Sequence, residues 1–187
     1  VKEIVNVALL RGDIGKPGAG VCPVRGHSNV QGDRSMGIWE KPSDLFLDRL
    51  RDEFGFEPPR EHGLDTVGSI QALRDGKIRV FFGMGGNFLS AMADTEYGAE
   101  SFRRLRLSVQ VSTKLNRNHL FAGKITYLLP CLGRIEEDVQ ASGPQAVSTE
   151  DSTSCIHGSR GKAKPASPHL RSEPRIVAEL AKRILPP

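Results

Sequence analysis

Three short apolar runs, separated by stretches with helical character, constrain the fold of this chain more than any other feature. They are KIRVFFGM at 77–84, RLSVQVS at 106–112 and KITYLLP at 124–130. Asp94 is placed to cap a helix that reaches about Leu105, and NRNHLF favours one helical turn before the third run. Strands that alternate with helical segments favour a parallel sheet. The sequence therefore predicts an α/β fold: a Rossmann-like three-layer domain with a mostly parallel sheet, preceded by a helix and a long glycine-rich loop.

Helical periodicity appears at four further places. VKEIVNVALLR opens the chain as a helix, Ser43 precedes DLFLDRLRDEFG as its N-cap, a helix spans about 65–75, and a last helix starts at Ser172. Residues 12–37 have no regular period and hold seven of the twenty glycines, and 131–172 are expected to be mostly loop with a strand at PQAVSTE.

Two regions follow from this pattern. Residues 1–40 are a helix and a glycine-rich cofactor loop at the end of a preceding domain, and residues 41–187 are an α/β nucleotide-cofactor-binding domain. The first helix has neither an initial Met nor a capping residue before it. We therefore expect the chain to be a piece of something longer.

Composition excludes several classes of protein. The chain has 38% hydrophobic and 26% charged residues with a formal net charge of +4, a mild and mixed excess that does not indicate nucleic-acid binding. Three scattered cysteines give no disulfide framework and indicate a reducing, cytoplasmic location. No apolar run reaches the ~18 residues of a membrane helix.

Glycines stand where the first predicted strand ends, at Gly83, Gly85 and Gly86, with Asn87 after them. Backbone N–H groups can approach a phosphate there, and open α/β sheets bind ligands outside the carboxyl ends of their strands. The pattern is neither the dinucleotide fingerprint, since Phe88 occupies the third glycine position, nor a P-loop. A tight turn without a ligand is the alternative.

The loop GVCPVRGHSNVQGDRSMG, residues 20–37, concentrates polar groups that suit a large phosphate-bearing heterocycle. Arg25 offers a planar fork for a carboxylate or phosphate. His27, Ser28, Asn29 and Gln31 add donors and acceptors, and Gly26 and Gly32 let the backbone close in.

Other clusters are weaker candidates. Cys131, Cys155 and His157 lack metal-ligand spacing, so no metal site is expected. Glu136, Glu137 and Asp138 follow a strand end but are typical of a solvated loop. Ser152, Ser154 and His157 lack the elbow motif of a hydrolase.

The motifs LLRGDIGKPGAGVCPVRGHSNVQGDRSMG, FFGMGGNFLSAMADT, STKLNRNHL and ITYLLPCLGRIEEDVQ, in this order, resemble the formate dehydrogenase group of the dimethyl-sulfoxide-reductase superfamily of molybdopterin oxidoreductases. The resemblance covers essentially all 187 residues. It implies a central fragment of an enzyme that binds molybdenum-bis(molybdopterin guanine dinucleotide), or bis-MGD. The molybdenum ligand and the cysteines of a [4Fe-4S] cluster would lie outside this chain.

The same resemblance implies roles for individual residues. Arg25 matches the Arg that helps orient a small anionic substrate such as formate at molybdenum, and His27 stands where formate dehydrogenases commonly carry Gln. Gly26, His27, Ser28, Asn29, Gln31 and Gly32 match the pterin-contacting loop. The guanosine-binding region is matched by Gly85, Gly86, Asn87, Ser112, Thr113, Lys114, Asn116 and Arg117.

Two functions remain open from the sequence. The first is a cofactor-binding part of a molybdenum-dependent oxidoreductase, inactive in isolation, with the remaining domains of the parent enzyme as its partners. The second is a non-catalytic Rossmann-like module that binds a nucleotide for regulation or assembly. The sequence identifies neither the electron-transfer partner nor the oligomeric state.

Overall fold

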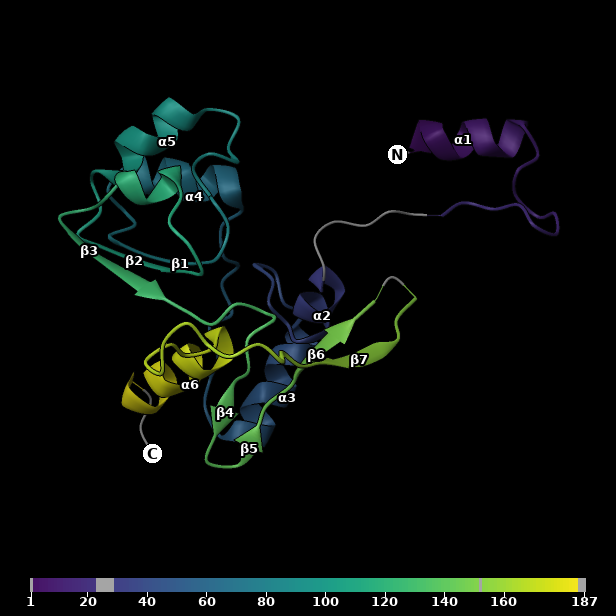
Figure 1. Cartoon of the computed structure of the whole chain (residues 1–187). Helices are drawn as coiled ribbons and strands as arrows, with labels where there is room; N and C mark the ends of the chain where they lie inside the picture. Colours follow the sequence, from purple (N-terminus) through teal and green to yellow (C-terminus); the bar gives the residue numbers. More distant parts are fainter. Residues whose placement is uncertain (1, 23–28, 152, 185–187) are drawn as a thin grey trace. The chain divides into compact units, whose positions relative to one another are not determined.

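The computed structural model describes residues 2–22, 29–151 and 153–184, which form two compact units (Figure 1). One unit contains the described part of Val1–Ile38 together with Ser148–Gly158, and the other contains Trp39–Val147 and the described part of Ser159–Pro187. The division predicted at residue 40 stays a prediction.

The helices are α1 (Lys2–Leu10), α2 (Val30–Ser35), α3 (Asp44–Phe54), α4 (Thr66–Arg74), α5 (Thr95–Phe102), the 3₁₀ turn η1 (Arg117–Leu120) and α6 (Glu173–Ile184). The strands are β1 (Val80–Met84), β2 (Leu107–Ser112), β3 (Ile125–Pro130), β4 (Val139–Gln140), β5 (Gly143–Pro144), β6 (Val147–Glu150) and β7 (Ile156–Ser159).

The second unit is built on a parallel sheet, as the sequence predicts. Within the described residues its strand order is β1-β2-β3, and Val80, Leu107 and Ile125 start the three strands in register. The 3₁₀ turn η1 between β2 and β3 confirms the predicted helical turn. The structure thus mixes helices with a parallel three-stranded sheet, which is compatible with the predicted α/β class.

Local capping explains where the helices begin. Ser43 Oγ accepts the N–H of Phe46 at 3.3 Å before α3, and Asp94 Oδ1 accepts the N–H of Tyr97 at 2.9 Å before α5. Asp65 makes the same contact with the N–H of Gly68 at 2.7 Å before α4. Each side chain satisfies a donor that would otherwise lack a partner at a helix start.

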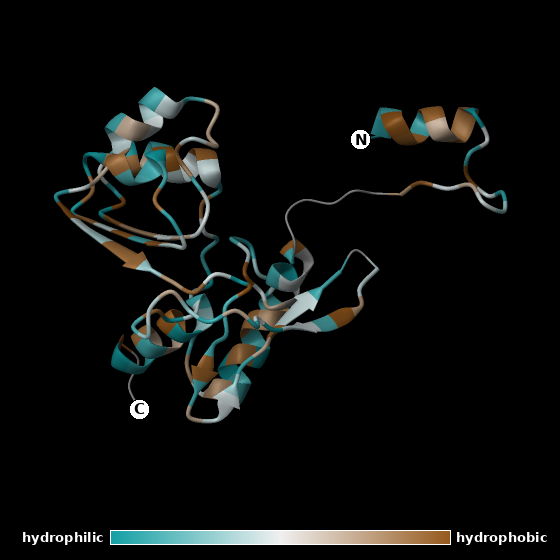
Figure 2. Ribbon diagram, viewed as in Figure 1, coloured by the Kyte–Doolittle hydropathy of each residue, from teal (hydrophilic) through white to brown (hydrophobic). Residues whose placement is uncertain are grey.

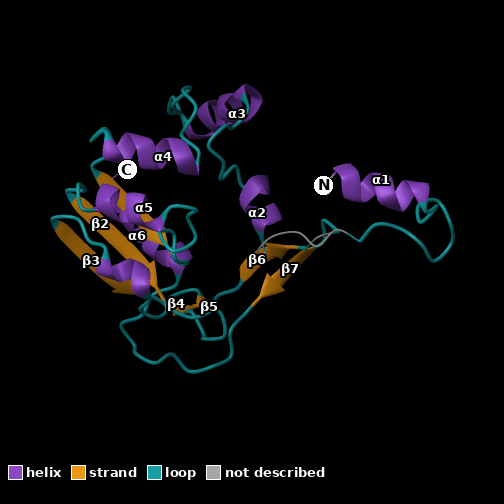
Figure 3. Ribbon diagram, turned by 90° about the horizontal axis from the view of Figure 1, so that it is seen from above, coloured by secondary structure: helices purple, strands orange, loops and turns teal. Residues whose placement is uncertain are grey.

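The core lies between the sheet and the pair α4 and α5, which cover one face of the sheet in both views (Figures 1 and 3). The ring of Phe81 from β1 meets the ring of Phe102 from α5 edge-on, with centroids 4.7 Å apart. Leu89 and Leu105 are fully buried beside them. A Cβ on Gly98 would lie 3.0 Å from Leu89, so the glycine lets α5 approach closely.

The other face of the sheet differs from the expectation of buried strands. Phe81 points into the core, while its neighbours Val80 and Phe82 remain 56% and 40% exposed. Figure 1 draws α6 on this side, yet none of the described α6 residues is buried. The prediction that KIRVFFGM is a buried strand holds for one side of β1 only, because α4 and α5 cover one face of the sheet.

Regular structure also occurs where the sequence suggested loop. Helix α2 lies inside 12–37, and it starts after Asn29 in the left-handed conformation, with φ of 66°. The predicted strand at PQAVSTE is confirmed as β6, while β4, β5 and β7 were not predicted. Such short elements carry too few residues for a periodic signal. No helix in the described part of the chain is long and apolar enough to cross a bilayer.

Candidate functional site

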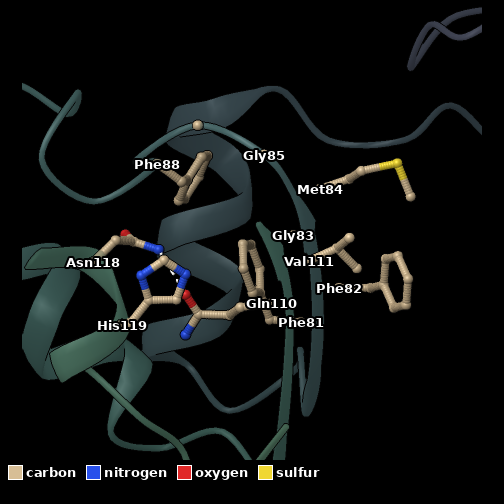
Figure 4. Close-up of a pocket in the computed structure, with 11 residues that line it drawn as sticks. Phe81, Phe82, Gly83, Met84, Gly85, Phe88, Gln110, Val111, Asn118 and His119 are labelled. Atoms are coloured by element: carbon tan, nitrogen blue, oxygen red, sulfur yellow. Dashed lines mark hydrogen bonds between the residues drawn. The ribbon is translucent and has the colours of Figure 1, made fainter. Parts of the chain in front are cut away.

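A cavity of about 220 Å³ lies at the carboxyl ends of β1 and β2, where the sequence predicts a ligand site (Figure 4). Its wall combines the glycine turn after β1 with Gln110 of β2 and with Asn118 and His119 of η1. In Figure 4 these three polar side chains lie together, while Phe82 and Met84 point away from them. The cavity therefore has one polar wall, formed by β2 and η1.

A buried hydrogen-bond network shapes that wall. Asn118 Nδ2 donates to Gln110 Oε1 at 2.9 Å, and Gln110 Nε2 donates to Ser108 Oγ at 3.2 Å. Asn118 Oδ1 accepts the backbone N–H of Leu89 at 2.8 Å. Because buried polar groups are costly when unpaired, these contacts fix η1 against β2 and against the loop after β1.

The glycine turn after β1 requires its glycines for backbone reasons. Gly85 and Gly86 both have φ of +67°, the left-handed region that side chains with a Cβ disfavour. Gly85 N–H donates to Val111 O at 2.8 Å, which joins the turn to β2. A Cβ added at Gly86 would meet no atom of the described residues within 4 Å, so this side of the turn is open for a ligand.

A second cavity of about 260 Å³ lies beside the first, at the carboxyl ends of β2 and β3. Gln110 and His119 line both cavities and separate them. The second cavity adds the polar stretch 112–114 and apolar side chains of Leu115 and Leu128. One edge of the sheet thus offers a glycine turn next to a partly apolar slot.

Two of the predicted binding residues shape this edge through contacts within the protein. Asn116 Nδ2 donates to Gly86 O at 3.0 Å, so it holds the glycine turn. Asn116 N–H also donates to His119 Nδ1 at 2.9 Å, which orients the imidazole. Ser112 Oγ donates to Lys114 O at 2.7 Å and so closes the turn after β2.

The other predicted residues of this edge are open to solvent. Asn87, Thr113, Lys114 and Arg117 are all exposed, and Lys114 and Arg117 carry positive charge near the two cavities. A cationic edge beside an open glycine turn is suited to an anionic group such as a phosphate. The structure thus brings together the predicted residues of 85–87 and 112–117.

In the other unit, Asn29 forms contacts within the protein. Its Oδ1 accepts the N–H of Glu150 at 2.9 Å, and its Nδ2 donates to Ser148 O at 3.4 Å. A Cβ on Gly32 would collide with the Asn29 amide, so this glycine makes room for that side chain. Both residues hold α2 to β6, and their predicted cofactor contacts stay a prediction.

The remaining predicted residues of the loop cannot be placed. Arg25, Gly26, His27 and Ser28 lie outside the described residues, as does the side chain of Gln31. The role of Arg25 as the group that orients a substrate therefore stays a prediction.

The acidic cluster after β3 has structural partners. Glu136 accepts the N–H of Gly133 at 2.6 Å and that of Ala166 at 2.8 Å, and both bonds lower its pKa. Asp138 accepts the hydroxyl of Ser172 at 2.5 Å. These carboxylates organise the loops before α6.

The cysteines and histidines form no metal site within the described ranges. Cys131 is buried, and its burial, followed by the charges of Glu173 and Glu136, raises the pKa of the thiol to about 11. His157 pairs instead with Asp151, with Nε2 and Oδ2 2.8 Å apart. The Cys131 thiol, with its raised pKa, thus stays protonated at neutral pH.

Sequence reasoning missed Gln110, Asn118 and His119. A signal was present in β2, where Ser108, Gln110 and Ser112 alternate with aliphatic residues in LSVQVS. Three polar residues on one face of a central strand indicate a buried polar contact or a ligand. Asn118 and His119 gave no comparable pattern, because their role depends on where η1 packs.

The comparisons with known proteins agree with an oxidoreductase relationship. No family model matches the chain. It is 56% identical, over all 187 residues, to an uncharacterized oxidoreductase of Mycobacterium bovis, and 54% identical, over 186 residues, to protein YdeP of Escherichia coli O6:H1. Each match spans 24% of the relative, so the chain spans about a quarter of the length of these proteins.

A more distant relative carries a more specific name. The chain is 27% identical over 143 residues to the putative formate dehydrogenase YrhE of Bacillus subtilis. This match covers 72% of the chain and 14% of YrhE. The sequence is therefore related to a segment of proteins named as oxidoreductases.

Proposed function

We propose that this chain is the cofactor-binding part of a molybdenum-dependent, formate dehydrogenase-like oxidoreductase, and that it holds the guanosine and pterin parts of bis-MGD. The observation that carries the proposal is the double left-handed glycine turn at Gly85 and Gly86, which opens onto a cavity at the carboxyl ends of β1 and β2. The oxidoreductase names of the relatives support it. The Rossmann-like, three-layer form of the domain is part of this proposal.

The residues at this edge fit a nucleotide diphosphate. The open side of Gly86 gives a phosphate access to backbone, and Lys114 and Arg117 supply charge that neutralises it. The slot beside Leu115 and Leu128 gives a planar base an apolar surface. Asn116 and His119 keep the turn and the wall between the cavities in place.

When bound, the molybdenum–pterin group supplies two-electron chemistry, and the protein supplies binding and orientation. In this proposal the residues of this edge would neutralise the phosphates and hold the nucleotide in place. Arg25 is proposed to orient a small anionic substrate, on the strength of the resemblance alone. The rest of the parent enzyme and an electron acceptor complete the proposed activity.

Cofactor analysis of the full-length, matured protein tests this function. We expect molybdenum by elemental analysis, and guanosine monophosphate after acid hydrolysis at about two per molybdenum, as bis-MGD requires. Nucleotide without molybdenum would favour the alternative of a regulatory or assembly module. Absence of both would refute the proposal.

A matched pair of lysines tests the site. Lys114 follows β2 at the carboxyl edge, and Lys124 precedes β3 at the opposite edge, and both are exposed. Lys114→Ala should lower guanine nucleotide content severalfold, because it removes a charge that faces the phosphates. Lys124→Ala should leave the content unchanged, and equal losses would show that the carboxyl edge is not the binding site.

A further inference from the structure

The face of the sheet that points away from α4 and α5 is apolar along all three strands. By strand alternation and register it is formed by Val80, Phe82, Met84, Leu107, Val109, Val111, Ile125, Tyr127 and Leu129. We call this set the open sheet face. It carries no charged side chain, and Figure 2 shows the hydrophobic stretch along β3.

Much of the open sheet face is accessible to solvent. Ile125 and Tyr127 of β3 are 56% and 57% exposed, although both belong to a parallel sheet. Parallel sheets are almost always covered on both faces, and contiguous exposed apolar patches mark contact surfaces. A parallel sheet with one solvent-exposed apolar face therefore lacks the layer that normally covers such a face.

The start of helix α6 approaches the carboxyl end of this face. Its first residue, Glu173, has Oε1 3.5 Å from where a Cβ on Gly85 would lie, and nearby Val111 is 1% exposed. Farther along α6, the apolar side chains of Val177, Leu180 and Ile184 are themselves exposed. The sheet and α6 thus present two apolar surfaces that cover each other incompletely.

The chemistry of the surface specifies its partner. Aliphatic and aromatic side chains without charge match the apolar stripe of an amphipathic helix, and helices are the elements that cover parallel sheets. The relatives that match every residue of this chain are about four times as long, so about three quarters of their length lies outside the match. A polypeptide of that length is long enough to supply a covering helix itself, without a second copy.

We infer that the open sheet face and the exposed stripe of α6 are the docking surface for one or more amphipathic helices of the same polypeptide, from outside these 187 residues. The inference rests on the sheet and on α6, and it holds whether or not the carboxyl edge binds a nucleotide.

Photo-crosslinking of the full-length protein tests the occupant. The crosslinking amino acid p-benzoylphenylalanine replaces Tyr127, whose aromatic ring it resembles, and crosslinked peptides are identified by mass spectrometry. We expect crosslinks within one polypeptide to residues outside the 187. Crosslinks to α6, crosslinks between copies with different tags, or no crosslink at all would each overturn the inference.

Thiol accessibility gives a second readout that does not depend on crosslinking chemistry. Tyr127→Cys is compared with Lys77→Cys, because Lys77 is 74% exposed and pairs only loosely with Asp75 at 3.5 Å. In full-length monomer, Tyr127→Cys should react with maleimide at least about tenfold more slowly than Lys77→Cys. Equal rates, or protection that disappears on dilution, would contradict coverage by the same chain.

Discussion

At position 86 both the left-handed backbone and the proposed ligand site require glycine. Its φ of +67° disfavours any side chain with a Cβ, while no described atom would block that Cβ. The glycine is thus required by backbone geometry in the protein itself, and the space beside it remains available to a ligand.

Replacement of Gly86 by Ala should lower the free energy of unfolding by about 1–2 kcal/mol through left-handed strain. It should also reduce bound guanine nucleotide in the full-length protein, because the Cβ enters the space left for a phosphate. Denaturant titration and nucleotide analysis measure the two effects.

Gly55 provides the matched control, since it ends α3 with φ of 69° and has open space around it. Gly55→Ala should cost similar stability and leave nucleotide content unchanged. If both variants lost nucleotide equally, the loss would reflect stability rather than contact.

Asn118 is the residue on which the buried network depends. Asn118→Ala removes the partner of Leu89 N–H and of Gln110 Oε1 at once. We expect the free energy of unfolding to fall by about 3 kcal/mol, since each unsatisfied buried group costs about 1–3 kcal/mol. The double variant with Gln110→Leu should lose less than the sum of the two single losses, and strict additivity would show that the two side chains are not coupled.

Among the elements, the hairpin of β6 and β7 has a turn that depends on one carboxylate. Asp151 accepts hydrogen bonds from Thr153 N and Cys155 N at 2.8 and 3.0 Å and pairs with His157. The bond from His157, followed by those from Thr153 and Cys155, holds the pKa of Asp151 well below its usual range. The turn is therefore organised by the ionised carboxylate.

Because the pKa of Asp151 is lower in the folded protein than in the unfolded chain, its ionised carboxylate stabilises the turn above the unfolded pKa of about 4. This contribution is lost as the pH falls toward the folded-state pKa. The protection factors of the amides of Thr153 and Cys155, relative to intrinsic exchange at each pH, should thus stay high at pH 5 and fall well below pH 4. His157→Ala should move the midpoint upward, because it removes the largest cause of the shift. A midpoint that did not move would assign the shift to the bonds from Thr153 and Cys155.

At the scale of the whole molecule, Asn29 joins segments that are far apart in the chain. Its amide bonds to the backbone of Ser148 and Glu150, about 120 residues later, while its own backbone is left-handed. Asn29→Gly keeps the backbone conformation and removes the side-chain bonds, and Asn29→Ala removes the bonds and adds strain.

We expect Asn29→Ala to be less stable than Asn29→Gly by about 1 kcal/mol, measured by denaturant titration. Both should be less stable than the natural protein, because Glu150 N–H loses its partner. If Asn29→Gly matched the natural protein, the bonds between Asn29 and β6 would contribute nothing to stability.

The sequence by itself determined the features that depend on neighbouring residues. Apolar runs marked the three strands of the sheet, and Ser43 and Asp94 marked helix starts, because capping and periodicity act over a few positions. The glycines after β1 likewise indicated a turn at a strand end. For the candidate site, the strand-end glycines indicated the turn at 85–87, while 112–114, 116 and 117 were implied by the family resemblance alone.

Only the tertiary structure decided which distant groups meet. The contacts of Asn118 with Gln110 and Leu89, and of Asn29 with β6, join segments whose pairing no local pattern encodes. Strand alternation in the sequence could not show that α4 and α5 would cover one face and leave Tyr127 exposed on the other. Burial is a property of what packs against a surface, and packing partners are fixed by the fold as a whole.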